Sequence, residues 1–213
     1  MKGSLKITDS FVFYEAASTD IKKRISAILP NISKQIEPKV AILINSAIFS
    51  SPTTQSLLAG KLKDDFGLFG NVASTALQNV INYISQNIEV KLETAKGSIL
   101  TLSIIVPSGD ISSILDLPGA SYPSKSGEIT WLEWLLTRGT EVIIGDFWVF
   151  PHAKGFTRSG GRSIMLRLVN QGEPFRVDPG YAGTAEDNFI IRAIEPIGED
   201  ILKLAYDAVV RSL

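Results

Sequence analysis

The sequence predicts an α+β fold in which helices lead, strands fill the middle and a helix closes the chain. Apolar residues recur every three or four positions over residues 19–49, 71–87 and 185–213, which is the period of amphipathic helices. Over residues 88–106 the period changes to two, which is the period of half-buried strands. The 213 residues suit a single domain, with an antiparallel sheet packed against N-terminal helices and a long C-terminal helix.

The N-terminal 17 residues contain an apolar run, residues 11–14, that needs a surface to cover it. Residues 1–17 are therefore interpreted either as a strand packed on this domain or as an N-terminal arm packed on another subunit. The helix expected over residues 19–49 contains Pro30 and Pro38, and a proline inside a helix removes a hydrogen bond. We expect one bent helix or two helices that break near Pro38.

A second helix should begin at Pro52 and end near Gly67, and residues 88–106 should form a β-hairpin with its turn at Lys96-Gly97. The remaining elements follow from turn residues and apolar periodicity. First come a short helix capped by Asp110 and running to Leu117, a loop over 118–128 and a helix over 131–136 ended by Gly139. A strand over 142–150, an extended loop over 151–163 and a strand over 164–169 follow, with turns at 171–172 and 178–180. The closing helix covers 185–213, is capped by Thr184 and is kinked at Pro196.

Composition excludes several classes of site. The chain has no cysteine, which excludes disulfides, zinc ribbons, iron–sulfur clusters and thiol nucleophiles. It has one histidine, His152, so a metal site built on several histidines is excluded and any Ser-His-Asp triad would need that residue. The formal net charge of -1 disfavours a protein whose whole surface clamps nucleic acid, although a local basic patch remains compatible. No cofactor is predicted.

The sequence predicts neither a membrane span nor a signal peptide. Its longest apolar runs fall far short of the roughly 20 residues that cross a bilayer. Asp9 and Glu15 interrupt any apolar core of a leader. We expect a soluble protein made in a reducing cytoplasm.

The loop over residues 151–163 is the first candidate functional segment. Its sequence Arg158-Ser159-Gly160-Gly161-Arg162 fits an anion cradle, a flexible hairpin loop, or a basic loop that reaches toward DNA or a partner subunit. It lacks the spacing of a Walker loop, which disfavours nucleotide binding. His152 in the same loop is interpreted as a surface or hinge residue, with a general base as the alternative.

Other polar and aromatic pairs have simpler interpretations. Trp131 and Trp134 lie three apart on a short helix and are expected in the core, with a subunit interface as the alternative. The carboxylate pairs Asp64-Asp65 and Glu199-Asp200 are expected on solvated helix faces. Neither pair suggests a glycosidase or two-metal site.

Four segments then follow one another in a suggestive order. They are residues 131–140 (WLEWLLTRGT), 158–165 (RSGGRSIM), 174–177 (PFRV) and 182–189 (AGTAEDNF). This order resembles virion proteins of tailed bacteriophages that join head to tail, the neck, tail-completion and tail-terminator group. The long first helix followed by Ser51-Pro52 and by residues 56–62 (SLLAGKL) is also similar to that group.

The resemblance implies a virion structural protein at the head–tail junction, made in the host cytoplasm and without enzymatic activity. It implies a ring of six or twelve copies around the DNA channel, in contact with adjoining connector and tail proteins. DNA would pass through without sequence-specific binding. Subunit or inter-ring contacts are expected at Phe11, Phe13, Lys154, Phe156, Arg158 and Arg162, with the basic residues Lys154, Arg158 and Arg162 facing the channel.

Two alternative functions remain open from the sequence. One is a small hydrolase or nucleotide-binding enzyme that uses His152 and the Gly160-Gly161 loop. The other is a non-phage adaptor domain that docks through Trp131 and Trp134.

Overall fold

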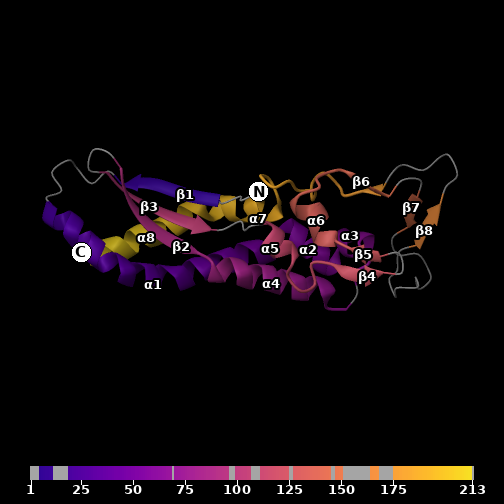
Figure 1. Ribbon diagram of the computed structural model, residues 1–213, viewed down its shortest axis with the longest axis horizontal. Helices are drawn as coiled ribbons and strands as arrows, with labels where there is room; N and C mark the ends of the chain where they lie inside the picture. Colours follow the sequence, from indigo (N-terminus) through magenta and orange to yellow (C-terminus); the bar gives the residue numbers. More distant parts are fainter. Residues whose placement is uncertain are drawn as a thin grey trace.

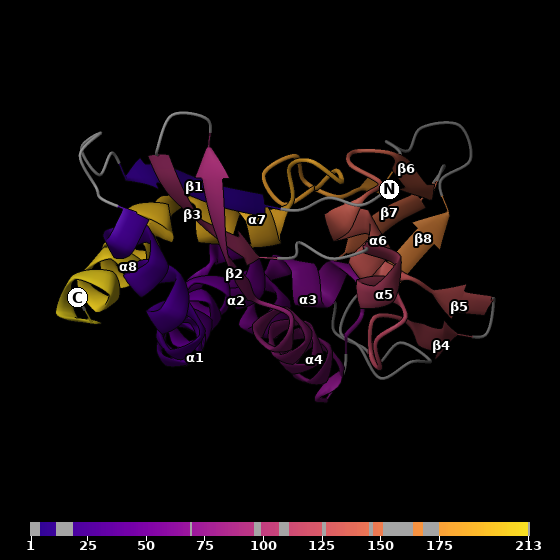
Figure 2. The ribbon, with the colours of Figure 1, turned by 60° about the vertical axis from the view of Figure 1, so that its left-hand side comes forward.

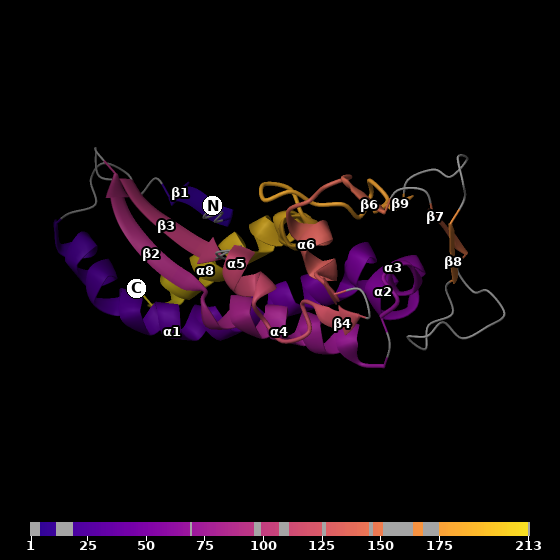
Figure 3. The ribbon, with the colours of Figure 1, turned by 45° about the vertical axis from the view of Figure 1, so that its right-hand side comes forward.

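The computed structural model is an elongated molecule built along one long helix, and it confirms the α+β class (Figure 1). The residues that it describes are 5–11, 19–68, 70–95, 99–106, 111–124, 127–144, 147–150, 164–167 and 175–212. A three-stranded sheet lies toward one end of the molecule, and short strand pairs lie toward the other end (Figures 1 and 3).

Helix α1 (Thr19–Ser50) forms the spine and continues through Pro30 and Pro38 without a break. Its buried face is a stripe with one residue every four positions: Ile32, Ile36, Val40, Ile44 and Ile48. Burying one such side chain stabilises by about 1.5–3 kcal/mol, so the stripe on both sides of Pro38 outweighs a proline penalty of about 3 kcal/mol. The predicted helix is therefore confirmed, and the alternative with two helices is wrong.

The second predicted helix is in fact two helices, α2 (Pro52–Ala59) and α3 (Lys61–Asp65), separated by Gly60. The chain turns at Gly60 because the Ser56 hydroxyl accepts a hydrogen bond from the Leu62 amide, at 3.1 Å. A Cβ on Gly60 would lie only 2.8 Å from the Ser56 Cα, so this close turn needs glycine. The third predicted helix is confirmed as α4 (Val72–Gln86).

The hairpin predicted over residues 88–106 is confirmed as β2 (Glu89–Ala95) and β3 (Ile99–Val106). A third strand, β1 (Leu5–Phe11), pairs antiparallel with β3, so the order in the sheet is β1-β3-β2. Residues 5–11 thus form a strand of this domain's own sheet, whereas residues 1–4 and 12–18 lie outside the described residues. The sheet contacts α1 through β2 (Figure 2).

The next segment contains two helices that were predicted and one hairpin that was not. Helices α5 (Ile111–Leu115) and α6 (Trp131–Leu136) lie where the sequence placed them. Asp110, the predicted cap of α5, lies outside the described residues. The predicted loop over 118–128 contains a short hairpin, β4 (Tyr122–Ser124) and β5 (Gly127–Ile129).

We call residues 140–182 the arm. The residues that flank it are joined beside α6 by a hydrogen bond, and its described parts are strands β6 to β9 and the turn near residue 180 (Figures 1 and 3). The strand predicted over 142–150 is two strands with different partners. Strand β6 (Val142–Ile144) pairs with β9 (Phe175–Arg176), and β7 (Phe147–Phe150) pairs with β8 (Ile164–Arg167). Strand β9 was not predicted, because two residues give no periodic signal.

The closing helix is divided into α7 (Phe189–Ile194), a 3₁₀ turn η1 (Glu195–Ile197) and α8 (Gly198–Ser212). The predicted start at residue 185 is wrong by four positions. The kink predicted at Pro196 is a tightened turn, because proline removes a donor from the helical ladder. Helix α8 packs along α1 and also contacts β1 (Figure 2).

Two isoleucines on α1 should separate core packing from surface effects. Ile44→Ala should lower the free energy of unfolding by about 2–5 kcal/mol, because the Ile44 side chain is fully buried. Ile42→Ala removes the same atoms from a side chain that is 66% exposed, and it should change stability by less than about 0.5 kcal/mol. Urea unfolding followed by circular dichroism measures both, and equal losses would show that the stripe is wrongly placed.

Candidate functional site

Two of the four segments in the sequence pattern, residues 131–140 and 182–189, meet at the base of the arm. The Gly139 amide donates a hydrogen bond to the Gly183 carbonyl at 2.8 Å, which closes the arm where it leaves and rejoins the body. Gly139 has φ of +58°, a left-handed conformation that glycine adopts without strain. The end of α6 and the start of the closing helices are thereby tied together.

Gly183 fits against the last turn of α6 with no room for a side chain. A Cβ at this position would lie 2.0 Å from the Leu135 carbonyl oxygen and 2.9 Å from the Asn188 Cβ. Atoms of a folded protein do not approach this closely, so the contact requires glycine. Leu135 and Leu136 are themselves buried, so the contact reaches directly into the core.

Asn188 caps α7 and connects it to the arm base. Its Oδ1 atom accepts hydrogen bonds from the amides of Ile190 and Ile191, at 3.1 and 3.2 Å, and its Nδ2 atom donates to the Thr184 carbonyl. The predicted cap, Thr184, instead accepts from the Asp187 amide at 3.1 Å and closes the turn before the helix. Both residues are good caps locally, but only Asn188 is buried where the helix begins.

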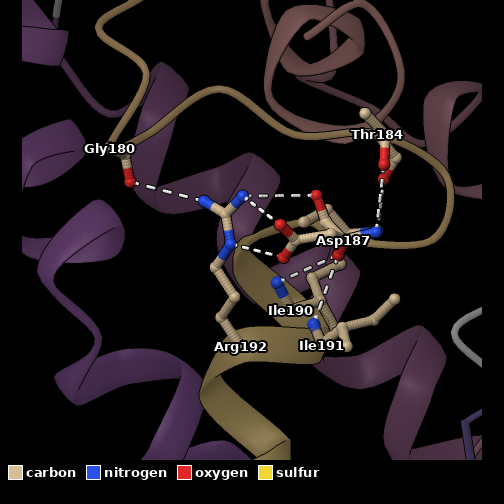
Figure 4. Close-up of polar contacts among 7 residues, drawn as sticks. Gly180, Thr184, Asp187, Ile190, Ile191 and Arg192 are labelled. Atoms are coloured by element: carbon tan, nitrogen blue, oxygen red, sulfur yellow. Dashed lines mark hydrogen bonds and ion pairs between the residues drawn. The ribbon is translucent and has the colours of Figure 1, made fainter.

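Arg192 pairs with Asp187 in the turn before α7 and also reaches the turn at Gly180, where the arm ends (Figure 4). The guanidinium binds both carboxylate oxygens, with Nε–Oδ1 at 2.5 Å and Nη2–Oδ2 at 2.7 Å, and its Nη1 atom donates to the Gly180 carbonyl at 3.4 Å. Hydrogen bonding to Arg192 lowers the pKa of Asp187. The same bond raises the pKa of Arg192. A planar, two-pronged donor suits this geometry, which a lysine would not reproduce.

The tryptophan pair divides between core and surface. Trp131 is fully buried, its indole Nε1 donates to the Gly119 carbonyl at 2.8 Å, and its ring lies 6.1 Å from that of Phe66. The core interpretation is confirmed for Trp131, which cannot serve as a docking surface. Trp134 is half-buried beneath the Arg138 guanidinium, 5.7 Å from the ring centre, and Arg138 in turn pairs with Glu133.

The two carboxylate pairs differ in their exposure to solvent. Glu199 and Asp200 are exposed, as expected, but Asp65 is buried and the expectation of a solvated face is wrong for it. Burial raises the pKa of Asp65, while the hydrogen bond from Lys61 opposes that rise. Asp178, in the turn that ends the arm, adds to the rise. Asp65 therefore lies close enough to the arm base for the charge of Asp178 to raise its pKa.

The residues predicted to make subunit contacts are mostly beyond what the structure describes. Phe11 lies at the end of β1, opposite Leu100 of β3 in the register. The other five, and His152 with them, lie outside the described residues: Phe13, Lys154, Phe156, Arg158 and Arg162. The 151–163 segment connects β7 to β8, whose residues Phe150 and Ile164 are register partners.

The described residues contain neither a candidate metal site nor a candidate membrane-spanning helix. No group of three or more histidine, aspartate and glutamate residues is arranged there to hold a metal ion. No helix in the same residues combines the length and hydrophobicity that crossing a membrane would need.

The arm base was only partly visible in the sequence. The segments containing Trp131 and Gly183 stood out, but the contact between Gly183 and Leu135 joins residues far apart in the chain. The five-residue spacing of Asp187 and Arg192 is not a helical pairing distance, so it gave no signal.

Comparison with known proteins adds no constraint, since no family model, curated protein or solved structure matches this chain.

Substituting two glycines should test the close contact at the arm base. Gly183→Ala should lower the free energy of unfolding by about 1–3 kcal/mol or more, because the new methyl group overlaps the Leu135 carbonyl. Gly198→Ala, where a Cβ meets nothing within 4 Å, should be neutral or stabilise by up to about 1 kcal/mol. Thermal unfolding of the two variants measures the difference. An unaffected Gly183→Ala protein would mean that α6 and the arm are not in contact.

Acidification should reveal the burial of Asp65. Its pKa is raised in the folded state, so the folded protein binds its proton more readily than the unfolded chain, and this carboxylate costs stability at neutral pH. That cost disappears as the pH falls through the raised pKa toward the ordinary value of 3.8. Asp65→Asn should therefore be more stable than the wild type at neutral pH, with a gap that narrows near pH 4, as measured by urea unfolding at several pH values.

Lys61→Ala should strengthen the pH dependence of stability that Asp65→Asn removes. Removing this cation takes away what lowers the pKa of Asp65, so the pH dependence should become steeper than in the wild type. A gap between Asp65→Asn and the wild type that stays constant with pH would contradict burial of the charged group.

Proposed function

We propose that this chain is a structural subunit of a tailed-phage virion, which forms a ring at the head–tail junction around the DNA channel. Its role would be that of a neck, tail-completion or tail-terminator component. The observation that carries the proposal is the arm: the segments whose order resembles that group form its anchored base and its strands.

The anchoring of the arm supports a mechanical role. The Gly139–Gly183 hydrogen bond and the Gly183–Leu135 contact fix both ends of the arm to the buried end of α6. Arg192, paired with Asp187, also holds the returning end through the Gly180 carbonyl. A segment that is fixed at both ends transmits force to the core, because neither end can move without disrupting buried packing. Such a base suits a projection by which one subunit holds another.

The composition of the arm's outer strands supports contact with a partner. Strand β7 reads Phe147-Trp148-Val149-Phe150, and its register partners in β8 include Ile164, Met165 and Leu166. Successive strand residues lie on opposite faces, so this two-stranded pair is apolar in sequence on both faces. A two-stranded ribbon is marginally stable alone in water, so a covering surface would stabilise it. In a ring, each neighbouring subunit offers such a surface.

The proposal assigns no chemical step to this chain. The ring would hold its subunits, six or twelve in number, against adjoining connector and tail proteins, and DNA would pass without specific contacts. The basic residues Lys154, Arg158 and Arg162 would line the channel or touch the next ring. A hydrolase that uses His152 is the alternative, and its distinguishing property is loss of turnover in a His152→Ala variant.

Particle assembly tests the proposal. Particles made without this chain should accumulate as separate DNA-filled heads and tails under electron microscopy, and adding the purified chain should join them. Deletion of residues 156–161 should leave the thermal unfolding transition intact but should abolish joining, because the flanking strands and arm base remain. Joined, infectious particles formed without the chain would refute the proposal. Loss of the unfolding transition in the deletion variant would place the loop in the core.

A further inference from the structure

Helices α1 and α8 lie beside each other at the end of the molecule that holds the three-stranded sheet (Figure 2). Their side chains border an open groove of about 640 Å³. We call the α8 side of this groove the α8 wall, formed by Asp200, Lys203, Leu204, Asp207, Ala208, Arg211 and Ser212. The opposite wall is formed by Gln35, Lys39 and Leu43 of α1. The charged side chains Asp200, Lys203 and Arg211 are exposed at this surface.

The charges on the α8 wall alternate in sign along the helix. Asp200, Lys203, Asp207 and Arg211 follow one another at intervals of three or four residues, so they lie on one face. Within the part of the chain that the structure describes, none of the four has an ion-pair partner within 4.0 Å. The row of charges therefore remains available to an incoming surface.

This order of charges is complementary to itself when it is read in the opposite direction. If a second α8 lies antiparallel across the first, Asp200 of one copy faces Arg211 of the other, and Lys203 faces Asp207. Each pair occurs twice, because a two-fold axis repeats every contact. The same alignment brings Leu204 against the small residue Ala208 between the two charged pairs. Larger and smaller side chains then interdigitate, as they do between packed helices.

We propose that the α8 wall is a two-fold interface at which a second copy of this chain docks through its own α8. The alternating signs favour this occupant over nucleic acid, because Asp200 and Asp207 would repel a phosphate backbone. This contact uses the same surface on both copies, whereas neighbours in a cyclic ring meet through two different surfaces. The proposal is therefore separate from the ring of the proposed function and stands or falls without it.

Charge reversal on the full chain tests the interface. Sedimentation velocity across a series of micromolar concentrations should show a monomer–dimer equilibrium that shifts toward monomer as salt screens the charges. Lys203→Asp or Asp207→Lys alone should weaken dimerisation about tenfold or more, because each places two like-charged pairs at the interface. The double variant, with both substitutions, restores opposite charges and should recover the dimer. Glu186→Lys, an equal charge change on an exposed residue outside the groove, should leave dimerisation unchanged.

Each outcome is decisive. A chain that stays monomeric at every concentration overturns the proposal, and so does a dimer that the single reversals leave intact. Binding of a DNA duplex by the monomer, lost in Lys203→Asp, also overturns it. If a single variant fails to give the wild-type circular dichroism spectrum, Asp200→Lys and Arg211→Asp provide a second pair for the same reversal and rescue. Failure to join heads and tails would leave these results untouched, so the two proposals are tested independently.

Discussion

The close fit of Gly183 against the Leu135 carbonyl determines how α6 is joined to the closing helices. A side chain at residue 183 would overlap that oxygen, since its Cβ would lie 2.0 Å away. The close approach lets the Gly139 amide bond to the Gly183 carbonyl and brings Asn188 to the start of α7. Helix α7 in turn packs on α1, the spine of the fold. The position of the arm and the direction of the closing helices therefore follow from one backbone contact.

The charged residues around this contact differ in how deeply they are buried, and therefore in how much they cost or add to stability. Asp187 is exposed and Arg192 is half-buried, and their paired geometry orients the turn rather than adding much stability, as is usual for ion pairs that water reaches. Asp65 is buried and its pKa is raised, so its hydrogen bond with Lys61 only partly offsets the cost of removing its charge from water. The Asp187–Arg192 pair fixes geometry at little cost, whereas the buried carboxylate is kept at the expense of stability. Its closeness to Asp178 links that cost to the turn that ends the arm.

Sequence periodicity was sufficient for the elements whose folding is local. The stripe from Ile32 to Ile48 and the alternation over β2 and β3 predicted α1 and the hairpin, because each pattern has the period of the element that it forms. The breaks at Gly60 and the cap at Asn188 were missed because tertiary contacts decide them: Ser56 bonds the Leu62 amide, and burial selects Asn188 over Thr184. The motifs of the arm base were predicted from the sequence, but their contact was not. The Gly183–Leu135 contact joins residues that only the fold brings together, and the 151–163 loop lies outside the described residues.

The two proposed interfaces differ in chemistry, and the difference follows from symmetry. The strands β7 and β8 are apolar in sequence on both faces, which suits insertion against a different surface of a neighbour, as a cyclic ring requires. The α8 wall is charged, and its signs match only when a copy of itself lies antiparallel, as a two-fold axis requires. An apolar face is stabilised by burial against any apolar surface. An alternating row of charges also destabilises a wrong register, because like charges then face each other. The arm would thus supply most of the binding energy of an assembly, and the α8 wall would supply selectivity for one orientation of a second copy.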